Sequence, residues 1–257
     1  MLEYADVTHV STQISYFEVT KDKITELSES ECLRRAEIAN KEYETRLEQD
    51  LTRWQENVKK SNPESVSLMG DGDTYLTEVT AGYLKYNVQA YNDGDRIFTI
   101  SARYEWLSAQ PIYRMVDVFG VVLGANSNYH NYNDLYYVYK ADVMIGNSSG
   151  NITYIPEKIL TPDKIIKAPQ GVAVAQTLIK NLIDSQQWIT ATDHRGYIKF
   201  RAKVTSTIIS GTAAAFYFQK RTGLEIVPSL GISGSNITIT PSAGYSLMSP
   251  NPAVSFS

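Results

Sequence analysis

The clearest pattern of apolar and polar positions begins at residue 28 and predicts one long amphipathic helix. Apolar residues return every three or four positions, which is the spacing of one helical face. They are Cys32, Ala36, Ala39, Tyr43, Leu47, Leu51, Trp54 and Val58. Ser28 and Glu31 form a capping-box pair at the start of this run. Asn62-Pro63 ends it, because proline disfavours helical geometry in the residue before it.

The narrow apolar stripe of this helix has two interpretations. It packs along the flank of a sheet, or it associates with a helix of another subunit, in which case the interface consists of Tyr43, Leu47, Leu51 and Trp54. Opposite charges four residues apart support the helix on its exposed side. These pairs are Glu31–Arg35, Glu37–Lys41 and Glu42–Arg46.

From about residue 75 the pattern changes to short alternating runs of β-branched and aromatic residues, separated by turns rich in glycine, asparagine and proline. The predicted strands are 10–17, 83–91, 96–106, 112–123, 135–145, 152–155, 196–209, 213–220, 224–228 and 237–241. Segment 171–184 is ambiguous, and we favour a strand over a helix beginning at 176. This pattern predicts a mostly β protein, an antiparallel β-sandwich of about 9–11 strands with one long N-terminal amphipathic helix.

Three regions follow from this pattern. Residues 1–66 hold an N-terminal strand and the long helix, residues 67–242 form the β-sandwich domain, and residues 243–257 form an extended tail rich in serine and proline. The helix is then an insertion or a bracket outside the sandwich.

One hairpin is specific enough to predict a register. With Asn92-Asp93-Gly94 as a three-residue loop and Gly94 in the left-handed conformation, apolar residues face each other across the two strands. The predicted pairs are Val88 with Phe98, Tyr86 with Ile100 and Leu84 with Ala102.

Three charged residues, Glu105, Arg114 and Asp117, interrupt the apolar strands at 103–120. If the turn at 108–111 is tight, Glu105 lies opposite Arg114 as a cross-strand ion pair. Tyrosine hydroxyls and backbone amides would satisfy Asp117, because a buried lone charge is very costly. Glu105 and Asp117 should not share a pocket, since their side chains have opposite parity. The three charges are therefore predicted to be structural rather than catalytic.

The pattern Tyr104-x-Trp106…Pro111-x-Tyr113-Arg114-x-x-Asp117 resembles strand pairs in uncharacterised exported proteins of Gram-positive bacteria. The resemblance covers roughly the β region and implies an extracellular or cell-surface protein. It implies no activity.

Composition narrows the class of partner. A net charge of −4 argues against a nucleic-acid partner, which usually leaves a basic surface. The single cysteine, Cys32, lies on the apolar stripe and is predicted to be packed. The sequence has no run of about 18 apolar residues that would predict a transmembrane segment, and its start lacks the pattern of a signal peptide.

The search for catalytic or metal-binding chemistry gives no constellation. His9, His130 and His194 lack zinc-ligand spacing, and we expect His194 in a polar turn that precedes a strand. No serine nucleophile signature or phosphate-binding glycine loop is present. Plain turns are preferred over calcium sites at Asp71/Asp73 and Asp93/Asp95, so no cofactor is expected.

The segment 126–137 is the strongest candidate for recognition. Tyrosine and asparagine together supply rigid rings and adaptable hydrogen bonds. The candidate binding residues are Asn126, Asn128, Tyr129, His130, Tyr132 and Tyr136. The alternative is a solvated hairpin loop followed by an aromatic strand.

The sequence thus favours a non-enzymatic exported or cell-surface protein that acts by binding a protein or by self-association, with strand addition at free edges as one route. A carbohydrate-binding module is the first alternative, with Tyr129, Tyr132 and Tyr136 stacking on a glycan from one exposed face. A phage or virion structural protein is the second, and a stable trimer would favour it.

Overall fold

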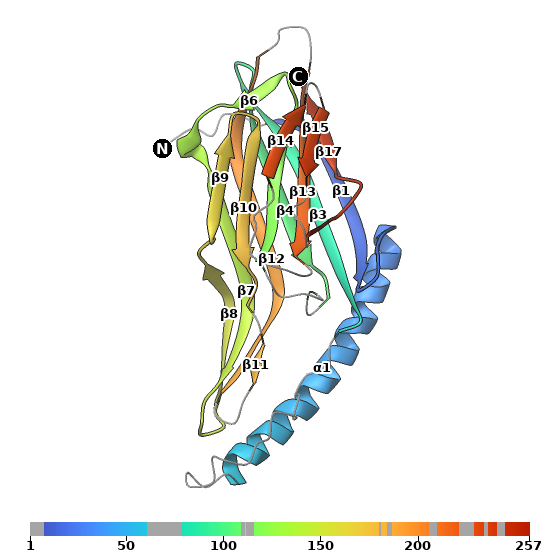
Figure 1. The fold of residues 1–257 in the computed structure, drawn as a ribbon, viewed down its shortest axis with the longest axis vertical. Helices are drawn as coiled ribbons and strands as arrows, with labels where there is room; N and C mark the ends of the chain where they lie inside the picture. Colours follow the sequence, from blue (N-terminus) through green and yellow to red (C-terminus); the bar gives the residue numbers. More distant parts are fainter. Residues whose placement is uncertain are drawn as a thin grey trace.

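The computed structural model describes residues 8–60, 79–108, 111, 116–179, 181–183, 187–205, 210–220, 229–233, 236–240 and 245–257. Within these ranges the chain forms two main antiparallel sheets that face each other, with one long helix beside them (Figure 1). The predicted fold class, a β-sandwich with a single long N-terminal helix, is confirmed.

The larger sheet has nine strands. Its main path runs through β2 (Ile24–Leu27), β1 (Thr8–Thr20), β3 (Ala81–Gly94), β4 (Ile97–Trp106), β12 (Trp188–Val204), β7 (Tyr136–Gly146) and β8 (Ile152–Leu160). Two short strands, β6 (Ser127–Tyr129) and β11 (Leu182–Ile183), also pair with β12. β12 therefore lies at the centre of this sheet.

The second sheet has six strands. Its path runs through β16 (Tyr245–Leu247), β13 (Gly211–Lys220), β5 (Val116–Leu123), β10 (Gly171–Thr177) and β9 (Lys164–Ala168), and β17 (Ala253–Phe256) also pairs with β13. β14 (Ser229–Ser233) and β15 (Asn236–Thr240) form a separate pair. Segment 171–177 is a strand, as we favoured.

The main hydrophobic core fills the space between the two sheets. Alternate residues of each strand point into it, for example Ile198, Phe200 and Ala202 on β12 and Phe119 and Val121 on β5. The other face of β5 is buried as well and belongs to a second cluster. This explains why β5 reads as a nearly continuous apolar run rather than as an alternating strand.

Helix α1 (Glu29–Lys60) begins with half of the predicted capping box. The Glu31 amide donates to Ser28 Oγ at 3.3 Å. The Glu31 carboxylate does not complete the box but accepts hydrogen bonds from Arg34 and Arg35, at 2.6–2.9 Å. Two arginines compete successfully for this carboxylate because charge-assisted hydrogen bonds are stronger than a bond to a neutral amide.

The apolar stripe of α1 packs against the chain's own sheet. Near its start, Cys32 and Ala36 contact Tyr16 and Tyr83. Near its end, Trp54 packs on Trp188 with ring centroids 5.7 Å apart.

The residues that we considered for a helix–helix interface therefore pack along the flank of the chain's own sheet, which was the first of the two interpretations. Tyr43 and Trp54 are buried, and Leu47 and Leu51 are half-buried. In Figure 1 the helix runs from the β1 and β3 side towards the end of the molecule where β7, β8 and β11 lie.

The predicted register of the β3–β4 hairpin is wrong. Val88 lies opposite Ala102, not Phe98, so the register is displaced by four residues. The displacement is even, so apolar residues still face apolar residues, which was the basis of the prediction.

The cause of the displacement is the turn. The chain reverses at Asp95-Arg96, and both residues have positive φ values, of 51° and 62°. Such a two-residue turn usually contains Asn-Gly or Asp-Gly, and here arginine stands in the glycine position, so the turn was not predicted. Gly94 takes φ +88°, as we predicted, but at a bulge where its amide binds Asn92 Oδ1 at 2.8 Å.

Both ends of the chain differ from the regional division that we expected. β1 pairs with β3 along most of its length, so the N-terminal strand belongs to the large sheet. β16 and β17 pair with β13, so the described part of the expected tail extends the second sheet. Alternating side chains explain this, because Val254 and Phe256 are buried in the core.

β4 and β5 do not form the hairpin that we assumed for the three charged residues. β4 belongs to the larger sheet and β5 to the second sheet, so the chain crosses the sandwich between them. Arg114 lies outside the described residues. Glu105 lies opposite Lys85 and Arg195 and forms an ion pair with Arg103 at 3.1 Å.

Candidate binding face

The outward positions of β12 form the most strongly patterned surface of the described chain. From Arg195 onward, the residues between the buried ones are Arg195, Tyr197, Lys199, Arg201 and Lys203. Four of these five carry a positive charge. Because β12 lies at the centre of the nine-stranded sheet, these side chains have neighbours from strands on both sides.

Two β-bulges shape this face next to Arg195. On β12 the register with β7 shifts between Thr192 and Arg195, and Asp193 has a φ of 53°. On β8 the register with β7 shifts opposite Asp142, and Glu157 has a φ of 48°. A non-glycine residue at positive φ is strained, and such strain concentrates at functional sites.

The two bulges bring two carboxylates to one guanidinium. Arg195 forms an ion pair with Glu157 at 2.6 Å and another with Asp193. Lys140 reaches the same Glu157 carboxylate at 3.2 Å. Arg195 and, to a smaller extent, Lys140 lower the pKa of Glu157 below its ordinary value. A bulge re-aims side chains, and here it aims both acids at Arg195.

A hollow of about 250 Å³ opens beside this network. Its lining side chains are Arg103, Val138, Lys140, Glu157, Arg195 and Tyr197. Arg103 comes from β4, Val138 and Lys140 from β7, Glu157 from β8, and the others from β12. Three cations and one acid line the hollow, while Glu105 and Asp193 lie at its margin through their ion pairs.

Gly196 lies between Arg195 and Tyr197, and a side chain at this position would face the opposite side of the sheet. A Cβ atom there would lie 2.1 Å from Tyr104 Cε1, so only glycine admits this close approach of the Tyr104 ring. The same short stretch therefore combines tight inward packing with an outward hollow.

Two tyrosines stand next to the hollow. Tyr136 is 53% exposed, and its ring meets that of Tyr197 at 6.0 Å with an interplanar angle of 60°. Burial raises the pKa of Tyr197 above its ordinary value, although a hydrogen bond with Ser101 acts in the opposite direction. The two rings do not form one flat platform.

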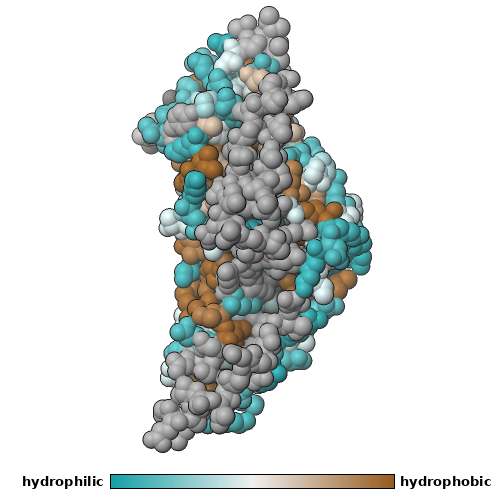
Figure 2. Space-filling model, in the orientation of Figure 1, coloured by the Kyte–Doolittle hydropathy of each residue, from teal (hydrophilic) through white to brown (hydrophobic). Residues whose placement is uncertain are grey.

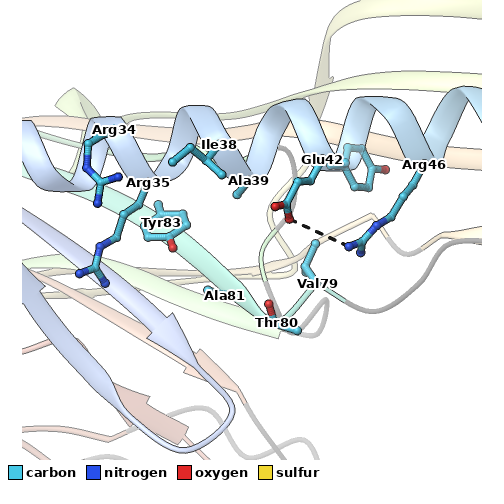
Figure 3. A pocket seen from close by; sticks show the side chains of 11 residues that line it. Arg34, Arg35, Ile38, Ala39, Glu42, Arg46, Val79, Thr80, Ala81 and Tyr83 are labelled. Carbon is cyan, nitrogen blue, oxygen red and sulfur yellow. Dashed lines mark ion pairs between the residues drawn. The ribbon is translucent and has the colours of Figure 1, made fainter.

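A second hollow, of about 270 Å³, lies between α1 and the start of β3 (Figure 3). Arg34, Arg35 and Arg46 line it, but each is already paired with a carboxylate of the chain. Arg35 alone binds both Glu31 and Glu18. We therefore take the hollow beside Arg195 as the better candidate site.

The predicted recognition segment is folded against the large sheet rather than projecting as a free loop. β6 pairs with the end of β12, and a short 3-10 helix follows at Tyr132–Asp134. The Asn126 carbonyl accepts from the Thr205 amide at 2.8 Å. Asn128 and His130 are exposed, and nothing is described of the Tyr132 side chain.

Of the three tyrosines predicted to stack on a glycan, Tyr129 does not face solvent. It is buried and stacks on Phe200 with ring centroids 4.8 Å apart and an angle of 6°. Alternation explains this, because Tyr129 lies opposite Ala202, whose side chain points into the core. Tyr136 is exposed, as the prediction required.

Asp117 is satisfied by the partners that the sequence suggested. It accepts hydrogen bonds from the Tyr217 hydroxyl at 2.5 Å and from the Lys220 amide at 3.2 Å. Trp106 Nε1 donates to the same Tyr217 oxygen at 2.9 Å. Burial raises the pKa of Asp117 to about 8, although both of its hydrogen bonds act in the opposite direction. The carboxyl is thus kept mostly neutral at pH 7, inside the buried core.

His194 does not lie in a turn. It is buried inside the continuous strand β12, and its Nδ1 lies 2.5 Å from the Tyr139 hydroxyl. The polar residues around His194 form the β-bulge of β12. In sequence a bulge resembles a turn, because both favour polar residues that tolerate positive φ. Cys32 is buried, as we expected.

Of the two acidic pairs considered for calcium, only one lies within the described residues. Asp71 and Asp73 lie outside the described residues. Asp93 accepts from Thr99 Oγ1 at 2.7 Å, and Asp95 is exposed in the turn. Among the described residues, no group of three or more His, Cys, Asp or Glu side chains is arranged to hold a metal ion.

Sequence reasoning missed the residues around Arg195. The bulge residues Asp193 and Glu157 read as loop positions, and Arg195 lay outside the strand predicted at 196–209. One signal was available, because residues 195–203 place a basic or aromatic residue at every second position. Such alternation predicts a basic face on a half-buried strand.

No protein-family model matches the chain, and no curated protein sequence matches it. A match among solved structures is the C-terminal domain of the Streptococcus pyogenes antigen I/II-family protein AspA, at 13% identity and a TM-score of 0.27. That alignment covers 54% of this chain and 49% of the AspA chain, so the chain spans about half the length of this structure.

A second match is the KRT10-binding region domain of the pneumococcal serine rich repeat protein PsrP, at 11% identity and a TM-score of 0.25. It covers 55% of this chain and 80% of that chain. TM-scores this low carry no argument about function. Within the described ranges, no helix has both the length and the apolar character needed to cross a bilayer.

Proposed function

We propose that this protein is a non-enzymatic binding protein, exported or held at a cell surface, and that it binds through the outward face of the nine-stranded sheet. The hollow beside Arg195 carries the proposal. It joins side chains from four strands, and two strained bulges hold its charges in place. Binding sites are typically concave and largely preformed, with a few convergent polar groups.

The chemistry of the hollow suits recognition. Its arginines are fixed in space by carboxylates, yet they retain N–H donors, since a guanidinium has five and Arg103 forms a single ion pair among the described residues. Val138 and the Tyr197 ring add an apolar contact. The location outside the cell is part of the proposal and rests on the strand-pair pattern around Tyr104 and Asp117.

The test is a binding panel of neutral glycans, acidic glycans and purified extracellular proteins. We expect the wild-type chain to bind at least one member. The double variant Arg103→Ala/Lys140→Ala should lose that binding, whereas Lys164→Ala/Lys167→Ala, with the same change in charge on β9, should keep it. Equal binding by both variants would refute this face as the site, and binding to no member would count against the proposed function itself.

Self-association is a second candidate, favoured by exposed apolar side chains on β8 and β9, on the side of the molecule where hydrophobic surface gathers in Figure 2. Ile159 on β8 is 65% exposed and Ile165 on β9 is 41% exposed. Strand addition at these edges is disfavoured, because β8 carries Pro156 with a bulge and β9 carries lysines.

Light scattering over a range of protein concentrations tests self-association. A defined oligomer that the double variant Ile159→Lys/Ile165→Lys dissociates would support it, and a stable trimer would favour a role in a virion. A strict monomer would exclude it.

A further inference from the structure

The basic face of β12 continues beyond the hollow. Lys199, Arg201 and Lys203 are all exposed and occupy successive outward positions. Alternate residues of a strand lie about 7 Å apart, so these charges form a straight row. Together with Arg195 the row is about 27 Å long, which suits an extended ligand rather than a single small molecule.

Uncharged polar side chains run parallel to this row on the neighbouring strands. Ser101 on β4, opposite Lys199, is buried, and the half-buried Gln89 on β3 lies opposite Ser101. Asn87 lies in the next outward pair, opposite Arg103. The amides of Asn87 and Gln89 both donate and accept hydrogen bonds, which is the pairing that sugar hydroxyls require.

The acids on this face do not block it. Asp134 binds Arg201 at 2.8 Å, Glu105 binds Arg103, and Glu157 and Asp193 bind Arg195. The more exposed of these pairs, Arg103–Glu105 and Arg201–Asp134, contribute about 0–1 kcal/mol each, so a ligand anion can replace their carboxylates at small cost.

Lys199 and Lys203 are different from these arginines. Among the described residues, neither forms an ion pair with a carboxylate. The two lysines are therefore the most accessible charges of the row.

We propose that this row binds an acidic polysaccharide, lying along β12 with its carboxylate, sulfate or phosphate groups on the cations and its hydroxyls on Asn87 and Gln89 of β3. This inference rests on the proposed function and names its ligand class. One sugar residue of the polysaccharide occupies the hollow beside Arg195. The following sugar residues contact the row along β12, from Lys199 towards Lys203.

A nucleic acid fits this face less well. Single strands bind to exposed aromatic faces on which successive bases stack. Here Tyr136 and Tyr197 meet at 60°, and Tyr129 is buried.

The test is affinity for three immobilised probes: heparin, which carries sulfates and uronates, polygalacturonate, which carries carboxylates alone, and poly(dT). We expect the wild type to bind a polysaccharide more tightly than poly(dT), with binding that weakens as salt rises. The variant Lys199→Ala/Lys203→Ala should bind about tenfold more weakly. Lys164→Ala/Lys167→Ala has the same net charge and should bind like the wild type.

The outcomes separate the two proposals. Equal weakening of both double variants would show an unspecific charge effect and refute the row. Tighter binding to poly(dT) would replace the polysaccharide with a nucleic acid. If neither polysaccharide binds while Arg103→Ala/Lys140→Ala still loses a neutral glycan or a protein from the panel, the acidic polysaccharide is refuted and the proposed function stands.

Discussion

The molecule contains two clusters of charged and aromatic side chains that differ in their access to water. The inner cluster joins Asp117, Tyr217 and Trp106 between the sheets, and every member is buried. The outer cluster centres on Arg195, and its acid Glu157 is well exposed. The inner one holds a single acid, bonded to a neutral hydroxyl and a backbone amide, whereas the outer one balances several charges.

This difference shows how water decides the role of a charge. Inside, desolvation favours the neutral carboxyl, and the hydrogen bonds serve to fix how the sheets pack. Outside, the charges stay ionised and exchange partners cheaply, so they are available to a ligand. Changes to the inner cluster should therefore alter stability, and changes to the outer cluster should alter binding.

The largest effect is expected from Tyr217→Phe. Removing this hydroxyl leaves the Trp106 indole N–H and the Asp117 carboxyl without their shared partner, at a cost of about 2–4 kcal/mol in the free energy of unfolding. Urea denaturation measures it. Tyr154→Phe, which removes an exposed hydroxyl bonded to Asp142, is the matched control and should cost less than about 1 kcal/mol. Equal losses in the free energy of unfolding of the two variants would contradict the distinction between the buried and the exposed cluster.

The second prediction concerns pH. The folded pKa of Asp117 is about 8 and its ordinary value is 3.8, so the folded chain retains a proton that the unfolded chain releases. The free energy of unfolding should therefore fall as pH rises from 5 to 8, by an amount on the order of a few kcal/mol.

In Asp117→Asn this fall should largely disappear, because the amide does not titrate. Unfolding curves of both proteins at pH 5, 6, 7 and 8 test it. A parallel pH dependence in the two proteins would mean that Asp117 is ionised in the folded state.

The smallest effect on stability is expected from Glu157→Gly. Glycine relieves the positive φ of this residue, a gain of about 1 kcal/mol that offsets the loss of exposed ion pairs. The free energy of unfolding should then change by less than about 1 kcal/mol. Ligand binding should weaken, because Arg195 and Lys140 lose the carboxylate that positions them. Unchanged binding would show that the bulge on β8 has no part in the site.

The sequence predicted the inner cluster better than the outer one, for a physical reason. A charge in an apolar strand must be satisfied, so Asp117 and its type of partner followed from alternation and burial alone. The helix followed from its period and its cap. The outer site depends on two bulges and on the order of strands from four parts of the chain, which no local pattern encodes. The turn at Asp95-Arg96 was missed because Arg96 stands where such a turn usually has glycine.

The central claim is that the outward face of the large sheet binds the ligand, and a steric block tests it most directly. Tyr136→Cys and Ile165→Cys each place a thiol at an exposed position, the first beside the hollow and the second on β9. Cys32 is buried, so a maleimide–polyethylene glycol reagent should label the new thiols selectively. We predict that labelling at 136 abolishes binding to the ligand that the panel or the polysaccharides identify, and that labelling at 165 leaves it intact. Binding that survives the label at 136 would contradict the account.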